Sequence, residues 1–200
     1  MQIDGPPAVE TLNADQLARR QSIVHAALRA LTNSDYERVK ISQVARQSGV
    51  ALGTLYRYFA SKEHLFAAVY LEWQDLLKTK VERSAPRGAT EADRLRDVFD
   101  RVIRAFQLQP QFFGVLLMLQ TTTDPYANEI FQDSDGLYQD IVYSVFDGPA
   151  DTDRTAIVAT ISAVIYGGLT SWAMQRSTIK DVRTQLDATI RLIYEYCPEH

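Results

Sequence analysis

Apolar residues recur at helical spacing along almost the whole chain, and no segment alternates between apolar and polar residues as a β-strand does. Seven longer helices are expected, each bounded by capping residues, glycine or proline. They cover about residues 13–31, 61–83, 90–109, 111–121, 125–146, 152–175 and 179–196, the fifth with a candidate break at residues 133–136. With two shorter helices between the first and second, the pattern predicts an all-α protein of roughly nine or ten helices.

The two shorter helices lie within residues 41–62, separated by a very short link. Ile41, Val44 and Ala45 form one apolar face, and Gly49 then breaks the pattern before Leu55 continues it on a second helix. So short a link leaves room only for a tight turn, where glycine accepts a positive φ angle. This arrangement predicts a helix-turn-helix, whose second helix fits the major groove of DNA. A turn in some other helical bundle is the alternative.

Residues at the helix ends support these boundaries. Asn13 or Asp15 can cap the first long helix, Ser61 the second and Thr90 the third. We expect Asn33 to end the first helix, because asparagine tolerates left-handed backbone geometry.

The run from Gly53 to Leu65, GTLYRYFASKEHL, carries a more specific signal. It resembles the signature of the tetracycline-repressor (TetR) family of bacterial regulators, specifically over about residues 14–70 and only in architecture beyond them. The resemblance implies an N-terminal three-helix DNA-binding domain and a C-terminal helical bundle for ligand binding and dimerisation. We therefore expect a flexible tail over residues 1–12, the helix-turn-helix domain over 13–60 and the ligand-binding and dimerisation domain over 61–200.

The second short helix has side chains suited to double-stranded DNA. Gly53 lets the backbone come close to bases or phosphates, while tyrosine hydroxyls and Arg57 can meet phosphate. Leu52 and Thr54 can contact thymine methyl groups, and Ser42 is placed to cap the first short helix and touch phosphate. The residues expected to face an operator are Ser42, Arg46, Ala51, Leu52, Gly53, Thr54, Tyr56, Arg57, Tyr58 and Lys62.

The net charge of −4 at first argues against DNA binding, but the charge is unevenly distributed. Residues 1–62 hold 8 Lys/Arg and 5 Asp/Glu, whereas residues 63–200 hold 13 and 20. Attraction to phosphate acts over about 10 Å, so the local charge decides. Because the excess of positive charge is modest, DNA affinity is expected to depend on two copies acting together.

The helix over residues 152–175 is apolar on nearly all sides and must be covered on all sides. Gly167 and Gly168 each cost it about 1 kcal/mol relative to alanine, which close approach of another helix would explain. That helix can belong to the same chain or to a second copy. The TetR resemblance favours a homodimer formed by the last two helices, with the expected interface residues Ile161, Ile165, Gly168, Leu186, Ile190 and Ile193.

Aromatic residues are plentiful in the middle of the chain. Most must belong to the core, yet the same residues suit a cavity for a small hydrophobic effector, which the TetR resemblance also implies. The expected ligand-binding residues are Phe99, Phe106, Phe113, Leu116, Leu119, Gln120, Tyr126, Tyr143, Tyr166 and Trp172.

Two segments carry a narrower resemblance. Residues 50–59 (VALGTLYRYF) and 181–187 (DVRTQLD) are similar to the actinobacterial repressors of cholesterol and steroid breakdown. This resemblance implies an elongated effector of the steroid or acyl-coenzyme A type.

Motifs for catalysis or cofactor binding are missing from the sequence. His25, His64 and His200 lack neighbouring ligands at metal-binding spacing, and there is no phosphate loop or nucleophile elbow. We therefore expect neither an enzyme nor a cofactor or metal. The lone Cys197 suits a reducing cytoplasm, and no apolar run approaches the 18 residues of a membrane span. The competing interpretation is a helical small-molecule-binding protein without DNA function.

Overall fold

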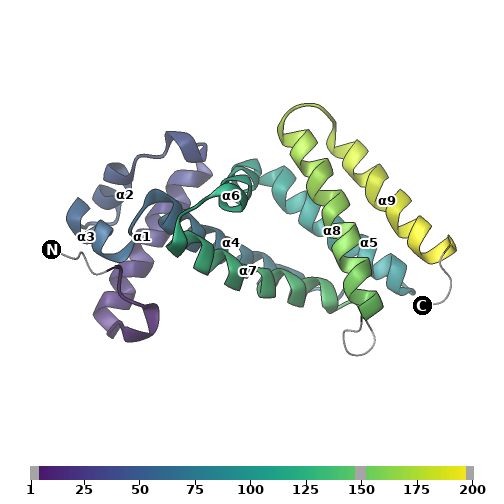
Figure 1. Cartoon of the computed structure of the whole chain (residues 1–200), viewed down its shortest axis with the longest axis horizontal. Coiled ribbons are helices and arrows are strands. Elements are labelled where there is room, and N and C mark those ends of the chain that lie inside the picture. The colour runs from purple at the N-terminus through teal and green to yellow at the C-terminus, as the bar shows by residue number, and fades with distance from the viewer. Residues whose placement is uncertain (1–4, 147–151, 197–200) are drawn as a thin grey trace. The chain divides into compact units, whose positions relative to one another are not determined.

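The computed structural model describes residues 5–146 and 152–196 of the chain. In this part the backbone forms nine α-helices and two short 3-10 helices, with no strand (Figure 1). The all-α prediction is confirmed. The α-helices are α1 (Ala14–Thr32), α2 (Ile41–Gln47), α3 (Leu52–Tyr58), α4 (Lys62–Glu82), α5 (Glu91–Leu108), α6 (Pro110–Thr121), α7 (Pro125–Tyr143), α8 (Thr152–Ala173) and α9 (Ile179–Tyr196), and the 3-10 helices are η1 (Val9–Thr11) and η2 (Tyr36–Arg38).

The capping residues act largely as expected. Asn13 forms a capping box with Gln16 at the start of α1, and the Ser61 hydroxyl accepts a hydrogen bond from the His64 amide at the start of α4 (2.9 Å). The Thr90 hydroxyl accepts one from the amide three residues into the next helix. Asn33 departs from expectation, because its φ of −109° is not left-handed. Its side-chain amide instead donates to a carbonyl of the last turn of α1, which ends the helix by another route.

The helices α5 and α6 meet at a sharp bend of 101°. Gln109 lies at the bend and has a non-helical backbone (φ −137°, ψ 65°). The following Pro110 excludes the helical region for its predecessor, yet fits the first turn of α6, where its missing N–H has no partner to lose. The candidate break in α7 is absent, since that helix runs without interruption from Pro125 to Tyr143.

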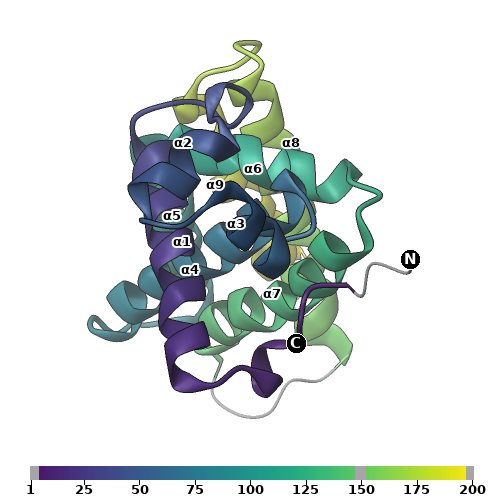
Figure 2. The same ribbon diagram turned by 90° about the vertical axis from the view of Figure 1, so that its left-hand side faces the viewer.

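Internal contacts divide the chain into two compact units, each described by itself. Unit 1 comprises Met1–Asp75 and Gly114–Asp135, and unit 2 comprises Leu76–Phe113 and Gly136–His200. In unit 1, α1 packs on α2 and α2 on α3 around buried Ile23, Leu31 and Leu55 (Figure 2). The expected domain boundary at residue 60 stays a prediction, and the segment after α6 belongs to the same unit as the helix-turn-helix.

Unit 2 is organised around α9. Its buried Val182, Leu186 and Ile190 lie one helical turn apart, on the single face that packs against α5 and α8. Two ion pairs tie α9 to α5: Arg183 Nε lies 2.6 Å from an Asp100 oxygen, and Arg96 Nε lies 2.8 Å from one of Asp187.

Candidate nucleic-acid interface

The turn between α2 and α3 has the geometry expected of a helix-turn-helix. Gly49 adopts a φ of +73°, which a side chain would make unfavourable, and its amide donates to the Arg46 carbonyl. The amide of Val50 reaches back to the Ala45 carbonyl (3.0 Å). These bonds end α2 in one tight turn and start α3 at Leu52.

The two sides of α3 differ in exposure. Leu55 is fully buried, whereas Leu52 and Tyr56 are 43% and 48% exposed although both are large and partly apolar. Gly53 lies between them with nothing within 4 Å of the position that a Cβ would take. The outer side of α3 is therefore an open surface of apolar, aromatic and backbone groups.

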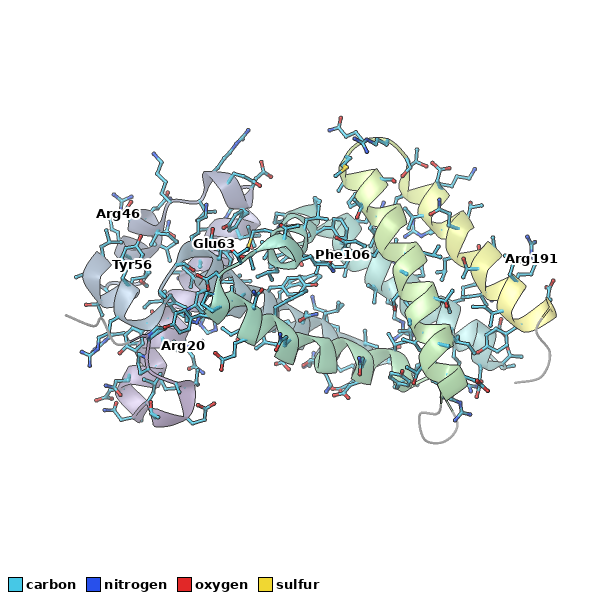
Figure 3. All side chains as sticks on the ribbon, viewed as in Figure 1. Arg20, Arg46, Tyr56, Glu63, Phe106 and Arg191 are labelled. Carbon is cyan, nitrogen blue, oxygen red and sulfur yellow. The ribbon has the colours of Figure 1, made fainter. Side chains whose placement is uncertain are left out.

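Most of the residues expected to face DNA lie on the exposed side of this helix pair. Figure 3 shows Arg46 and Tyr56 at the same end of unit 1. Exposure makes these residues available, and their contact with an operator stays a prediction. The exposed members are Ser42, Arg46, Ala51, Leu52, Gly53, Tyr56 and Arg57, while Thr54 is half-buried.

Tyr58 does not fit the predicted DNA face. It is only 5% exposed, because it lies three residues after Leu55 and shares that residue's inward side of α3. Ser42 is exposed, but it does not cap α2: the cap position is Lys40, and no side chain makes a capping bond there.

Lys62 was expected to face the operator, but its ammonium group is engaged inside unit 1. Its ammonium group donates to the Tyr36 carbonyl (2.6 Å) and lies 4.2 Å from the centroid of the Tyr36 ring. Burial lowers the pKa of Lys62, against an opposing effect of Glu37 and Glu63. The Tyr36 hydroxyl in turn donates to Glu63 (3.1 Å), so this group of residues fastens the connector before α2 to the start of α4.

The expected ligand-binding residues fall into both units. Within unit 2, Phe106 and Phe113 meet edge to face at 5.2 Å, and Phe113 lies 6.0 Å from Tyr166. Phe99 is buried, Trp172 is half-buried, and the Tyr143 hydroxyl makes a hydrogen bond with Thr155. The members in unit 1 are Leu116, which is half-buried, Leu119, which is buried, Gln120, which is exposed, and Tyr126, which stacks on His64.

The residues expected at the dimer interface are mostly covered by the chain itself, and their contact with a second copy stays a prediction. Ile161, Ile165, Leu186 and Ile190 are buried within the chain by the packing of α8, α9 and α5, and Ile193 is half-buried. Gly168 faces α9, because a Cβ there would lie 3.3 Å from Val182 Cγ1 and 2.7 Å from Gln185 Oε1. The close neighbour of this glycine belongs to the same chain.

A groove on the outer side of α8 and α9 is the surface that sequence reasoning missed. Ala163, Gly167 and Ser171 line it at four-residue intervals along α8, and a Cβ at Gly167 would meet nothing within 4 Å. Leu192 of α9 projects beside them and is 58% exposed. The spacing of small residues was the signal for this surface, and the larger isoleucines of the same helix obscured it. We call this surface the α8–α9 groove, with lining residues Ala163, Val164, Gly167, Gly168, Ser171, Gln185, Ala188, Thr189 and Leu192.

The helix α8 also has the length and apolar composition of a membrane span over Asp153–Ala173. Polar residues interrupt the apolar runs of this helix, so no uninterrupted run approaches 18 residues. Helices in the cores of soluble proteins share this length and composition. Here Ile157, Ile161 and Leu169 are buried within unit 2.

Within residues 5–146 and 152–196, no three His, Cys, Asp or Glu side chains gather as the ligands of a metal ion would. His25 faces Glu72 at 3.6 Å, and His64 is buried. Cys197 and His200 lie outside the described residues.

Comparison with known proteins supplies the context for these surfaces. Residues 23–69 match the family model described as "Bacterial regulatory proteins, tetR family". Residues 88–193 match the model described as "Tetracyclin repressor-like, C-terminal domain". Together the two matches cover the helix-turn-helix and most of α5 to α9.

Individual relatives agree with the two family models. The chain is 31% identical to the HTH-type transcriptional repressor KstR of Mycobacterium tuberculosis over 179 residues, which cover 89% of this chain and 81% of that protein. A TetR transcriptional regulator from Rhodococcus sp. RHA1 has the same fold with a TM-score of 0.73 and 25% identity, covering 90% of this chain and 97% of the other. The regulator FadR of Bacillus subtilis, solved in complex with stearoyl-CoA, matches in fold with a TM-score of 0.63 and 19% identity over 86% and 96% of the two chains. All three are regulators by name, in agreement with the expectation that this chain is not an enzyme.

Proposed function

The chain belongs to the tetR family of bacterial regulatory proteins, and we propose that it is a homodimeric repressor released from a palindromic operator by an elongated hydrophobic effector. As a member of this family it is a DNA-binding regulator of transcription. The proposal adds its oligomeric state, the sign of its regulation and the class of its effector. Such a protein acts in the cytoplasm, where the operator DNA lies.

The exposed outer side of α3 is the observation that carries the DNA-binding part of the proposal. A buried Leu55 anchors the helix, while Leu52, Gly53 and Tyr56 lie uncovered on its other side. Tyr56 can donate its hydroxyl to a phosphate, and the uncovered backbone at Gly53 permits close approach to base edges. An exposed surface of apolar, aromatic and backbone groups is costly in water and fits contact with the major groove of DNA.

The α8–α9 groove supports the homodimer. Small residues at four-residue spacing let helices approach closely, and the exposed Leu192 offers apolar area at its edge. We infer that a second copy packs here, with Gly167 at the contact and Gly168 on the inner side against α9. A symmetric dimer would present two α3 helices to half-sites about one DNA turn, roughly 34 Å, apart.

The effector class is inferred from the aromatic residues and from the relatives. Phe106, Phe113 and Tyr166 gather in unit 2 and offer apolar ring surfaces for a flat or long ligand. Relatives matched over most of the chain include KstR repressors, and a protein of the same fold holds stearoyl-CoA. We propose a steroid- or acyl-CoA-type thioester, which releases DNA only if it binds more tightly to the form with the wrong half-site spacing.

A mobility-shift titration tests the whole proposal. The full-length protein is mixed with duplex DNA from immediately upstream of its coding region, then with stearoyl-CoA or with a steroid-derived CoA thioester. We expect salt-dependent binding of one dimer to an inverted repeat, and release by one of the two thioesters. Binding that neither salt nor thioester changes would contradict the proposal, and a protein that binds thioester but no duplex would be a carrier.

A further inference from the structure

Four side chains from four segments meet in a row inside unit 1, and we call them the junction cluster: Arg20 of α1, Phe59 after α3, His64 of α4 and Tyr126 of α7. The Arg20 guanidinium lies 4.9 Å from the centroid of the Phe59 ring. The Phe59 and His64 rings meet edge to face at 5.3 Å, and the His64 and Tyr126 rings stack at 5.4 Å with an interplanar angle of 22°. The row links the end of α3 to the start of α7.

Phe59 is the residue through which the cluster touches α3. It follows the last residue of α3, is fully buried, and its amide donates to the Leu55 carbonyl (3.0 Å). A displacement of this ring therefore shifts the last turn of α3. The other end of α3 is held by the turn at Gly49, so the helix has one anchor on each side.

His64 is fixed from several directions and is buried. Its Nδ1 accepts a hydrogen bond from the Ala60 amide (3.2 Å), and its own amide donates to Ser61 (2.9 Å). Acceptance at Nδ1 requires a neutral ring that carries its proton on Nε2. Burial and then the charge of Arg20 lower the pKa of His64 to about 4, with Asp124 opposing, so the ring is neutral near pH 7.

Tyr126 is held just as firmly on the other side of the stack. It lies in the first turn of α7, where Asp124 accepts a hydrogen bond from the Ala127 amide (2.8 Å) and Ala127 is fully buried. The corner between α6 and α7 thus presents the Tyr126 ring at a fixed place. No sequence motif joins this residue to the helix-turn-helix, which ends more than sixty residues earlier.

We propose that Tyr126 is a positioning residue for operator binding: stacked on His64, it holds Phe59 against α1 and so sets the angle at which α3 meets DNA. The inference rests on the proposed function of DNA binding and goes beyond it. It moves Tyr126 from the expected ligand-binding residues to the DNA-binding unit. It also gives the α6–α7 corner a path of contacts to the end of the recognition helix, through His64 and Phe59.

Operator binding by full-length variants tests the inference. The operator is the duplex that the wild-type protein protects upstream of its coding region, and two altered operators have their half-sites one base pair closer or farther apart. Tyr126→Ala is expected to weaken binding about threefold to tenfold, the factor that an aromatic pair is worth, and to reduce the preference for the natural spacing. Tyr126→Phe keeps the ring and should bind within about twofold of wild type.

Phe131→Ala is the matched control, because Phe131 also lies on α7 and packs its ring on α4, 6.4 Å from Tyr70, away from the end of α3. It should lower the melting temperature yet leave operator affinity and spacing preference unchanged. Tyr126→Leu serves as a second variant if Tyr126→Ala does not fold, since it keeps apolar volume without a ring face.

The outcomes separate the two proposals. If the wild-type protein binds no duplex DNA, both the proposed function and this inference are overturned. Wild-type protein that binds, alongside folded Tyr126→Ala or Tyr126→Leu with wild-type affinity and spacing preference, overturns the inference alone. Equal losses for Phe131→Ala and Tyr126→Ala also overturn it, because the effect would then be general destabilisation.

Discussion

The helices α3 and α8 each carry an exposed glycine, but the sequence predicts the buried side of α3 better than that of α8. Along α3 the large residues alternate between sides, so Leu55 and Tyr58 are buried while Leu52 and Tyr56 are not. Along α8 nearly every side is apolar, and its isoleucines pack inside the chain while Ala163 and Gly167 stay on the surface. The sequence of an amphipathic helix predicts which side faces the core. The sequence of a uniformly apolar helix predicts only that the helix packs against more than one neighbour.

The largest effect that separates these two helices is expected from Gly53→Glu in α3. A side chain there meets nothing in the free protein, so folding should be unchanged. Against DNA, the same side chain places negative charge and bulk where the backbone would approach the duplex, and we expect operator affinity to fall by at least about 100-fold, roughly 2.7 kcal/mol. A mobility-shift titration with circular dichroism on the same samples measures both.

Gly53→Ala is the control for this prediction. Alanine stabilises an exposed helix position by about 0.5–1 kcal/mol and adds only one methyl group, so the protein should melt slightly higher and lose less affinity. Wild-type affinity for Gly53→Glu would mean that the outer side of α3 does not meet DNA.

The second prediction concerns the α8–α9 groove. Leu192→Arg would bury a charge in the proposed dimer contact, and we expect the dimer to weaken by on the order of 2–4 kcal/mol and operator affinity to fall with it. Met174→Arg is the matched control, since Met174 is exposed at the end of α8 but does not line the groove. Light scattering across a dilution series measures the change, and an undisturbed dimer in Leu192→Arg would move the interface elsewhere.

A third prediction uses pH to probe the junction cluster. The His64 pKa of about 4 lies below its ordinary 6.5, so between these values the unfolded chain binds more protons than the folded one. Stability therefore falls as pH decreases from about 6.5 towards 4, by on the order of 1–3 kcal/mol from this group. His64→Phe keeps a stacked ring without the titration, so its urea midpoint should lose less between pH 7 and 4.5. Equal losses in the two proteins would count against a buried neutral His64.

Several elements were predictable because local chemistry decides them. The caps at Asn13, Ser61 and Thr90 and the positive φ of Gly49 follow from short-range rules, and the structure has them as expected. The exposed set on α3 followed from the family signature, apart from Tyr58. The signature led us to expect Tyr58 to contact phosphate, but Tyr58 lies one turn after the buried Leu55 and therefore points inward.

The remaining features depend on contacts between distant residues. Lys62 donates to the carbonyl of Tyr36, and Tyr126 stacks on His64, which no spacing in the sequence indicates. Most of the residues expected at the dimer interface are large apolar side chains, and the chain buries these itself. The pattern of apolar residues predicts which segments form helices, but it does not predict which residues of different helices contact one another.

A fourth prediction compares the two neighbouring glycines of α8. Gly168→Ala brings a Cβ against Val182, so we expect a loss of about 1–2 kcal/mol in the free energy of unfolding. A Cβ at Gly167 would meet nothing within 4 Å, so Gly167→Ala should raise the free energy of unfolding of the protein by about 0.5–1 kcal/mol. Urea unfolding gives both values. A dimer weakened by Gly167→Ala alone would place the second copy against that glycine.

The smallest effect is expected from the ion pair between α5 and α9, where Arg96 also contacts Asp93 of its own helix. Arg96 is half-buried and Asp187 is exposed, and pairs that water reaches contribute only about 0.2–1 kcal/mol because water screens them. A double-mutant cycle of Arg96→Gln and Asp187→Asn should give a coupling energy of about 0.5 kcal/mol that disappears in 1 M salt. Neither variant should alter operator affinity, since α9 is already positioned by Val182, Leu186 and Ile190. A coupling energy of several kcal/mol, or a loss of DNA binding, would show that the packing of α9 depends on charge. Ion pairs would then contribute more to the stability of unit 2 than its buried apolar residues indicate.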